Sequence, residues 1–565
     1  MNALQPTYVN VYIGVLRWLI PILSAVMLFR CIRPLIAFRR EPELWGWIVL
    51  SDGTEIPVTH WENVIGRSKR SDIFIDFPTV SRSHAVLTRY DDGSWTIADA
   101  DSKDGVFVNK KRIKIRALRN GDVISVGGVD MTLQTVSQKN SNRQIPKRTK
   151  ASNLLYSFSN VIALTVLQLL CCVAYLFTGE KGTAQSVLLG FGGLMVIQWL
   201  LFLFYVSIRR NSFDLESVAF FLCTMGMCVI AAVAPDEAFK QLISTVMGIG
   251  FFLLIGWSLR DLEMAKQFRS VAAAVGIGFL LMTLLFGREY YGAKNWIVIG
   301  PMSMQLSEIT KVCFVYVGAS AMDRIMTKRN IIGFIVYSVL ICGCLALMND
   351  FGAALIFFMA FLVIAYMRSG SVGTIALACT ALGFAGIVAL KFAPHALQRF
   401  SNWRHIWEDP LGAGYQQTRA LMCMSSGGIL GLGAGKGQMR QYFAADSDVA
   451  VATLSEEWGM LMLIMVILCI VALAVFAVRS ASVGRSSFYT IGGCTAASIL
   501  VVQAILNALG TVDVVPLTGV TFPFLSNGGS SMIGAWGLLA FIKAADTRQN
   551  ASFAVKMTRE ELEDE

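Results

Sequence analysis

The sequence predicts a polytopic α-helical membrane protein with a small all-β domain inserted near its amino end. Of its 565 residues, 55% are hydrophobic and only 15% are charged, a charged share below that of soluble globular proteins. Apolar runs of about 18 residues or more, the length that crosses a bilayer as a helix, recur along the chain. Residues 45–136 break this pattern with returning charges and short alternating runs. These observations exclude an ordinary soluble enzyme.

The amino-terminal segment 1–44 is expected to be an uncleaved membrane anchor with a basic flank and its amino end outside. Its apolar run WLIPILSAVMLF is followed by arginines, and no small-residue cleavage site precedes them. The twelve cysteines mostly lie inside apolar runs, where a thiol behaves as a small hydrophobic group. They predict neither a disulfide framework nor a zinc site.

Residues 45–136 are expected to form a cytoplasmic β-sandwich. Short alternating runs such as IFIDF and HAVLTRY are separated by the turn sequences DDG, SKDG and RNGD. This spacing is typical of two packed antiparallel sheets. A basic polar linker, 137–153, follows the sandwich.

Twelve further apolar runs predict twelve spans, which makes thirteen with the amino-terminal one. Two additional spans lie in 154–210 and ten lie in 211–545. Alternating through them gathers the flanking Lys and Arg on one side, with the linker and the tail 546–565. Because positive charge collects on the cytoplasmic side, the long loop 392–453 is expected to be extracytoplasmic. The net charge of +10 therefore indicates membrane topology and not nucleic-acid binding.

Loop sequences of the sandwich carry a phosphate-binding pattern. In order along the chain they are Gly66-Arg67, Ser81-Arg82-Ser83-His84 and Val108-Asn109. The pattern resembles a forkhead-associated (FHA) domain over essentially the whole sandwich, and implies a site for a phosphothreonine peptide. Arginine suits this role because its planar fork makes paired, charge-assisted hydrogen bonds to phosphate. The roles implied are phosphate binding by Arg67 and Ser81, added charge from Arg82, a peptide-backbone contact by Asn109, and structural support by His84.

One departure weakens the expectation of phosphopeptide binding. Asp104 stands where the FHA family usually has Asn, and it places a carboxylate close to the expected phosphate. The alternative is a sandwich kept for protein contact without dependence on phosphate.

Four polar clusters interrupt the apolar runs on the predicted outer side. They are GAKNWIVIGPMSMQLSEITK (292–311), MNDFGAAL (348–355), the long loop, and PLTGVTFPFLSNGGSSMIG (516–534). Polar groups at membrane depth are costly, so such clusters are functional candidates. The loop sequence GLGAGKG lacks the Ser or Thr that ends a nucleotide phosphate loop and follows no strand, so no nucleotide is expected.

Taken in order, the four clusters resemble the SEDS family (shape, elongation, division and sporulation; FtsW/RodA/SpoVE-like), ten-span peptidoglycan glycosyltransferases of the bacterial cytoplasmic membrane. The resemblance covers roughly residues 215–545. It implies polymerisation of lipid II, a polyprenyl-pyrophosphate disaccharide, at the outer face, with a class B penicillin-binding protein as the transpeptidase partner. Together with the FHA-like domain it implies regulation through a phosphothreonine protein of a Ser/Thr kinase pathway.

The resemblance also implies the site residues. The family's essential aspartate precedes a paired acidic motif, here SEEW, and falls on Asp448, with Asp446 as the nearest competitor. Asp448 would be the base for the attacking hydroxyl, or a ligand of a divalent cation, Mg²⁺ or Mn²⁺. The residues expected to line the substrate cavity are Glu308, Lys311, Asp350, Arg399, Trp296, Ser526, Gly528, Gly529 and Ser530.

Alternatives stay open at this point. The chain could be a lipid II transporter, or a phospho-dependent membrane scaffold whose glycosyltransferase core is idle. Glu308, Lys311 and Asp350 could form an ion-pair network that serves stability alone. Asn295 and Asn527 stand where the family often has Arg and Tyr. The sequence does not separate elongation, division and sporulation roles.

Overall fold

The computed structural model describes residues 6–37, 44–60, 62–69, 71–89, 93–135, 153–179, 182–290, 292–299, 302–321, 328–392, 394–481, 486–548 and 550–555. All but the last residue of the predicted linker 137–153 lies outside these ranges, as does the end of the tail from residue 556.

Helices form at all thirteen predicted spans, which confirms the polytopic fold. Their bounds are α1 Pro6–Ile36, α3 Leu154–Thr178, α4 Ala184–Ser207, α5 Asp214–Val233, α6 Ala238–Ser258, α7 Leu262–Phe286, α8 Leu306–Ala321, α9 Lys328–Leu347, α10 Phe351–Ser369, α11 Val372–Phe392, α14 Ala450–Ala481, α15 Ser487–Thr511 and α16 Gly529–Ala544. Ten helices of the described residues are long and apolar enough to cross a membrane. With 16 residues each, α8 and α16 are shorter than the spans expected there.

The sandwich predicted for 45–136 is present as two packed sheets. Its strands are β1 Gly46–Leu50, β2 Glu55–Val58, β3 Glu62–Gly66, β4 Ile73–Phe74, β5 Ala85–Arg89, β6 Trp95–Asp99, β7 Val106–Val108, β8 Lys111–Ile113, β9 Ile115–Leu118, β10 Val123–Val126 and β11 Val129–Thr135. One sheet has the order β2-β1-β11-β10-β7-β8 and the other β4-β3-β5-β6-β9. Inward-facing residues such as Ile48, Ile65, Leu87 and Leu133 form its own apolar core.

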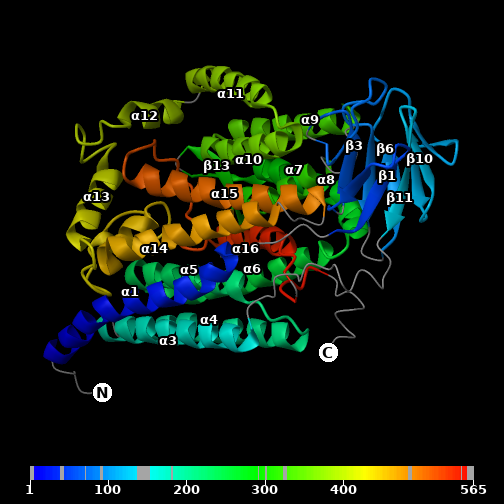
Figure 1. Cartoon of the computed structure of the whole chain (residues 1–565). Coiled ribbons are helices and arrows are strands. Elements are labelled where there is room, and N and C mark those ends of the chain that lie inside the picture. The colour runs from blue at the N-terminus through cyan, green and yellow to red at the C-terminus, as the bar shows by residue number, and fades with distance from the viewer. Residues whose placement is uncertain are drawn as a thin grey trace.

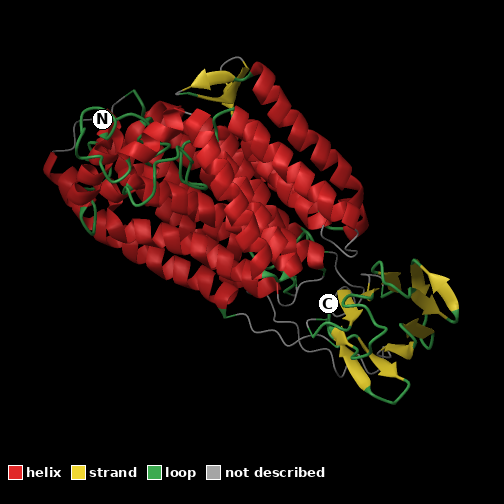
Figure 2. Cartoon of the chain, turned by 90° about the horizontal axis from the view of Figure 1, so that it is seen from above, coloured by secondary structure: helices red, strands yellow, loops and turns green. Residues whose placement is uncertain are grey.

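The sandwich lies at one end of the helical bundle and the long loop at the other (Figure 1). Figure 2 shows the strands of the sandwich set apart from the helices. A direct contact joins the two units, because Glu62 Oε2 of β3 accepts hydrogen bonds from Ser487 N at 3.1 Å and Ser487 Oγ at 2.7 Å. A carboxylate at the first residue of α15 is favourable, since the amino end of a helix carries partial positive charge.

The end of the bundle opposite the sandwich holds elements that the sequence did not predict. The long loop contains the short helices α12 (Pro394–Asn402) and α13 (Tyr415–Gly427), and a small antiparallel sheet combines β12 (Arg288–Tyr290), β13 (Ala293–Ile299) and β14 (Met302–Met304). α14 is interrupted at Gly459, whose φ of 84° lies in the left-handed region that favours glycine. Of these elements, β13, β14, α12 and α13 belong to the polar clusters described above.

Helices α1, α3 and α4 precede the ten helices that begin with α5, and we call them the accessory helices. They pack together along one side of the bundle, against α5, α6 and α14 (Figure 1). The sandwich is inserted between α1 and α3 in the chain.

Candidate functional site

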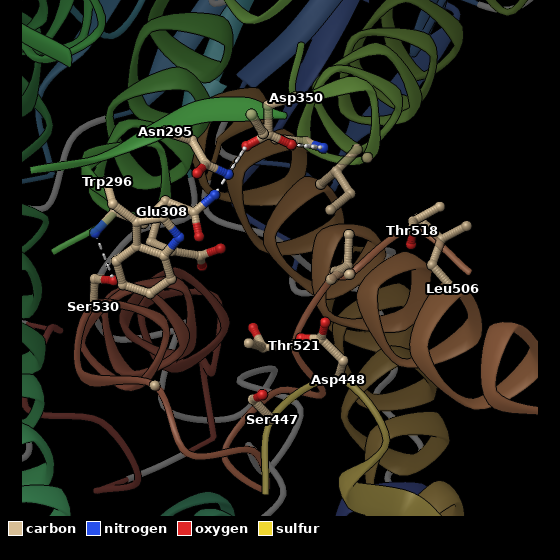
Figure 3. A pocket seen from close by; sticks show the side chains of 18 of the residues that line it. Asn295, Trp296, Glu308, Asp350, Ser447, Asp448, Leu506, Thr518, Thr521 and Ser530 are labelled. Atoms are coloured by element: carbon tan, nitrogen blue, oxygen red, sulfur yellow. Dashed lines mark hydrogen bonds between the residues drawn. The ribbon is translucent and has the colours of Figure 1, made fainter. Parts of the chain in front are cut away.

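A cavity of about 890 Å³ lies at the loop end of the bundle, and all four polar clusters contribute to its wall. Figure 3 shows Glu308 and Asp350 on one side of this cavity and Asp448 on the other. Nine of the ten residues expected here from the sequence line it: Asp448, Glu308, Lys311, Asp350, Arg399, Trp296, Gly528, Gly529 and Ser530. Segments far apart in the sequence therefore meet at one site.

Asp448 is held at the cavity wall two residues before α14. Its backbone carbonyl accepts a hydrogen bond of 2.9 Å from Asn507 Nδ2 of α15. A Cβ placed on Gly519 would lie 3.6 Å from Asp448 Oδ2 and 4.0 Å from Arg399 Nη1. The guanidinium also donates to Thr518 O at 3.0 Å. Because Gly519 has no side chain and a φ of +70°, the carboxylate and the guanidinium share one open space beside this turn.

The pKa of the Asp448 carboxyl is raised above its ordinary value. Burial is the main cause, since a charged group is poorly solvated there, and the nearby Asp446 raises the pKa further. Arg399 opposes both by favouring the ionised form. A half-buried carboxylate with a raised pKa beside a cation is suited to accepting a proton.

Asp446 is fixed by Asn527. The Asn527 side-chain amide donates to Asp446 Oδ2 and to Glu237 Oε2, both at 2.7 Å, while its backbone N–H donates to Asp446 O at 2.8 Å. Asp446 therefore accepts two hydrogen bonds from one residue, whereas the Asp448 carboxylate faces Arg399 and the open cavity. The geometry distinguishes the two neighbouring aspartates.

Glu308 and Lys311 form a buried ion pair of 2.6 Å on the first turns of α8. Their spacing of three residues places both on one side of the helix. Lys311 is 1% exposed, so the carboxylate of Glu308 replaces the water that would otherwise surround its side-chain nitrogen.

Asp350 is bound by neutral amides. Its Oδ2 accepts from Asn295 Nδ2 at 3.0 Å and from Gln305 Nε2 at 2.9 Å (Figure 3), and its Oδ1 caps α10 through Ala353 N at 3.0 Å. Among the residues that the structure describes, no cation is hydrogen-bonded to Asp350. Asn295 thus contributes a neutral hydrogen-bond donor to this wall.

The charged side chains that line the cavity are five carboxylates and three cations: Glu237, Glu308, Asp350, Asp446 and Asp448 with Lys240, Lys311 and Arg399. Within the described ranges no group of three or more His, Cys, Asp or Glu is arranged to hold a metal ion by itself. Mg²⁺ commonly uses one or two carboxylates and completes its shell with water and substrate phosphates. Asp448, whose carboxylate faces the open cavity, would be the ligand of such a cation, which would arrive with a phosphorylated ligand.

Ser526, the tenth expected residue, is not part of the cavity wall. Its hydroxyl donates to Ser447 O at 2.7 Å and accepts from Phe522 N at 2.9 Å. It therefore ties the 516–528 segment to the residue before Asp448. Ser530, on α16, does line the cavity, and its hydroxyl accepts from Gln305 N at 3.1 Å.

The loops at one end of the sandwich bring Arg67, Ser81 and Arg82 together with both arginines exposed. Ser81 N donates to His84 Nδ1 at 3.0 Å, so the ring carries its proton on Nε2 and donates to Gly105 O at 3.1 Å. His84 is fully buried and connects the Ser81 loop to Gly105 through these two hydrogen bonds.

Asn109 lies at the turn between β7 and β8, and its side-chain amide is used inside the sandwich. Nδ2 donates to Asp122 Oδ1 at 2.8 Å, and Oδ1 accepts from Val123 N at 3.0 Å. These bonds brace the turn, and the peptide contact implied by the FHA resemblance stays a prediction.

Sequence reasoning did not identify Asn507, Gln305 or Glu237 as parts of the site. Asn507 is 1% exposed, and its amide also donates to Val520 O at 2.8 Å, so it joins the Asp448 loop to the 516–528 segment. For Asn507 the signal in the sequence is a polar residue inside the apolar run 487–510. Burying a polar side chain in such a helix is costly unless it is hydrogen-bonded.

Comparison with known families matches two parts of the chain. Residues 218–551 match the family FTSW_RODA_SPOVE, described as cell cycle protein, and residues 63–127 match the FHA domain.

Among curated relatives, the peptidoglycan glycosyltransferase RodA of Mycobacterium tuberculosis (strain ATCC 25618 / H37Rv) is 27% identical over 325 residues, covering 54% of this chain and 69% of the relative. The probable peptidoglycan glycosyltransferase FtsW of Nitrosococcus halophilus (strain Nc4) is 32% identical over 333 residues, covering 55% and 85%.

Two solved structures are also similar. One, described as "Structural coordination of polymerization and crosslinking by a peptidoglycan synthase complex", is 22% identical over 59% of this chain and 96% of that chain, with a TM-score of 0.49. The other, described as "Structural and functional analysis of phosphothreonine-dependent FHA domain interactions", is 25% identical over 16% of this chain and 98% of that chain, with a TM-score of 0.16.

Proposed function

Because the chain belongs to the FtsW/RodA/SpoVE family of cell cycle proteins, we propose that it is a peptidoglycan glycosyltransferase that polymerises glycan strands from lipid II. The observation that carries the proposal is the meeting of Asp448 and Arg399 beside Gly519, in a cavity walled by all four polar clusters. The activity would take place at the outer face of the bacterial cytoplasmic membrane, with the FHA domain in the cytoplasm. The clustering of Lys and Arg on the FHA side of the spans supports this orientation.

In the proposed reaction the 4-hydroxyl oxygen of the incoming lipid II sugar attacks the anomeric carbon of the growing chain. The new carbon–oxygen bond forms as the bond from that carbon to the lipid pyrophosphate breaks, and the pyrophosphate leaves with the bonding electrons. Asp448 takes the proton of the hydroxyl, and Arg399 stabilises the negative charge on the leaving group. A bound divalent cation, Mg²⁺ or Mn²⁺, would neutralise further charge on the pyrophosphate. The excess of carboxylates in the cavity supports such a cation.

The proposal is tested by incubating the purified full-length chain with lipid II and a class B penicillin-binding protein, its proposed transpeptidase partner, and separating the glycan products. Polymer formation is expected. A transporter instead would move lipid II across vesicles while making no glycan, and a scaffold would do neither. The placement of Asp448 near Arg399 beside Gly519 favours the enzyme, because neither alternative requires a base there.

The pH dependence of polymerisation is expected to report the raised pKa of Asp448. Because the base must be ionised, the rate falls as pH drops through this pKa and is retained above it. Arg399→Gln removes the charge that lowers the pKa, so the acid limb should move to higher pH. Initial rates across the acidic range measure it, with Arg440→Gln, an exposed loop arginine outside the cavity wall, as control. If Arg399→Gln leaves the acid limb of the rate profile at the same pH, the assignment of Asp448 as the base is contradicted.

We further propose that the FHA domain binds a phosphothreonine protein of a Ser/Thr kinase pathway. Exposed Arg67 and Arg82 beside Ser81 support this. Calorimetric titration of the full chain with a phosphothreonine peptide should show binding that the unphosphorylated peptide lacks. Arg67→Ala should weaken it by about 10- to 100-fold, the effect of losing hydrogen bonds to a charged group.

The matched control for Arg67→Ala is Arg119→Ala, which removes an exposed arginine at the turn before β10. This variant should bind as the wild type does. Equal affinity of all three proteins for both peptides would leave the domain as a protein contact independent of phosphate.

A further inference from the structure

The long loop 392–453 contains a glycine-rich segment, residues 427–439, that has no assigned role in the proposed reaction. Four of its glycines are spaced two residues apart: Gly431, Gly433, Gly435 and Gly437. Three of them have positive φ, +79°, +103° and +69° in chain order, which side chains rarely adopt. Glycine is therefore required at these positions by the backbone conformation. The neighbours of each glycine give a second reason, because they leave no room for a side chain.

Two of the glycines face α14. A Cβ on Gly431 would meet the backbone of Glu457, and one on Gly437 would lie 2.7 Å from Glu456 Oε2. The backbone of the segment also pairs with the helix, through Leu432 N to Glu456 O at 2.8 Å and Gly433 N to Glu457 O at 2.9 Å. One side of the segment is thus hydrogen-bonded to α14.

The alternate glycines face the accessory helices. A Cβ on Gly433 would meet Ile13 Cγ2 of α1, and one on Gly435 would lie 2.5 Å from Thr178 Oγ1 of α3. The segment therefore lies between α14 and the accessory helices, and glycine is required on both sides because both approach its backbone closely.

Tyr175 of α3 joins the two sides. Its hydroxyl donates to Glu457 Oε2 at 2.6 Å and accepts from Trp458 Nε1 at 3.0 Å, and all three side chains are buried. Glu457 Oε1 in turn accepts from Gly437 N at 3.3 Å. Through one carboxylate, an accessory helix is connected to the backbone of the glycine-rich segment.

The attachment of α3 to the core extends along its length. Ser157 Oγ donates to Asn211 O at 2.7 Å near its first turn, and Gln168 Nε2 donates to Thr224 Oγ1 at 3.1 Å near its middle. Polar contacts of this kind hold helices together where no hydrophobic effect acts between them. α3 thus provides a fixed support and not a loose tether.

The segment leads directly to the catalytic loop. The Glu456 carboxylate accepts from Gln438 N and Met439 N, both at 2.9 Å, and the chain then reaches Asp448 before it enters α14. We propose that Tyr175 is a positioning residue for the loop that carries Asp448, and that the accessory helices form the wall against which this loop is held. The effect of Tyr175 on turnover rests on the proposed function, whereas the effect of Tyr175 on the position of the loop does not.

The test is Tyr175→Phe in the full-length protein, which keeps the ring and removes only the hydroxyl. Backbone hydrogen exchange of residues 430–441 is expected to become about tenfold faster, because their anchor on Glu457 is weakened. Polymerisation should show a kcat lower by about tenfold, with the KM for lipid II nearly unchanged, as expected when the reacting geometry is lost and binding is kept. Glu457→Gln should reproduce the exchange result, and the two changes combined should be less than additive because they act through one contact.

The matched control is Tyr156→Phe, on the same helix, which removes a hydroxyl that donates to Arg30 O at 2.9 Å. It should alter neither exchange of the segment nor kcat. Unchanged exchange in Tyr175→Phe, or the same increase in Tyr156→Phe, would overturn the proposed link. Faster exchange with an unchanged kcat would overturn the positioning role. If the wild type makes no glycan, the proposed function fails, and exchange alone decides whether Tyr175 holds the segment.

Discussion

Replacing Asp448 with asparagine is expected to lower the rate of glycan polymerisation by about 100- to 10,000-fold, the usual contribution of a positioned general base. The amide keeps the size of the side chain and leaves the Asn507 hydrogen bond to the backbone intact, because that bond uses the carbonyl of residue 448. Glycan produced from lipid II by the purified protein and its partner is the measurement. Wild-type output from Asp448→Asn would refute the mechanism.

The control for this substitution is Asp446→Asn, two residues earlier. Its carboxylate is held by Asn527, so a much smaller loss is expected. Titration with Mg²⁺ and Mn²⁺ separates the two roles of Asp448. A ligand of the cation would give a variant that recovers at high metal concentration, whereas loss at every concentration assigns proton transfer.

Breaking the Glu308–Lys311 pair is expected to destabilise the folded protein by about 3–5 kcal/mol, since either single change leaves a buried charge without its partner. Glu308→Gln and Lys311→Met are the single variants. The double variant should recover most of the stability because neither charge remains. Thermal unfolding in detergent measures the effect.

Glu408→Gln is the matched control, because His405 and Glu408 have the same spacing but are 60% and 77% exposed. It should leave unfolding nearly unchanged. A double variant that is stable but makes no glycan would show that the buried pair is needed for activity as well as for stability. One that is both stable and active would limit the pair to stability, the alternative that the sequence left open.

The helices and the sandwich could be predicted because each is a local pattern. Apolar runs located the thirteen helices at the predicted spans, but not α12 and α13, and alternation with turn sequences located the sandwich. The lining of the cavity by Glu308, Asp350 and Asp448 was expected only from the family resemblance, since nothing in their spacing brings three distant segments together.

The rest depended on tertiary contacts. Among the described strands, β12, β13 and β14 form a sheet of their own in a loop between spans, so their periodicity is too brief to identify. Asn507 and Tyr175 lie in apolar runs and gain their roles from partners on other helices. The side chains of Ser526 and Asn109 make hydrogen bonds within the fold, which no residue type reveals, and their expected ligand contacts stay predictions.

The contact between Glu62 and Ser487 has a consequence for signalling. β3 runs from Glu62 to the loop of Arg67, so the docked end and the proposed phosphate site are separated by roughly 16 Å of strand. A phosphoprotein captured there need not dislodge the domain from α15. It would instead be tethered beside the membrane at an effective concentration of about millimolar, as for other linked partners. In that arrangement the kinase would control which proteins gather around the enzyme, and recruitment would need no change in the enzyme's own shape.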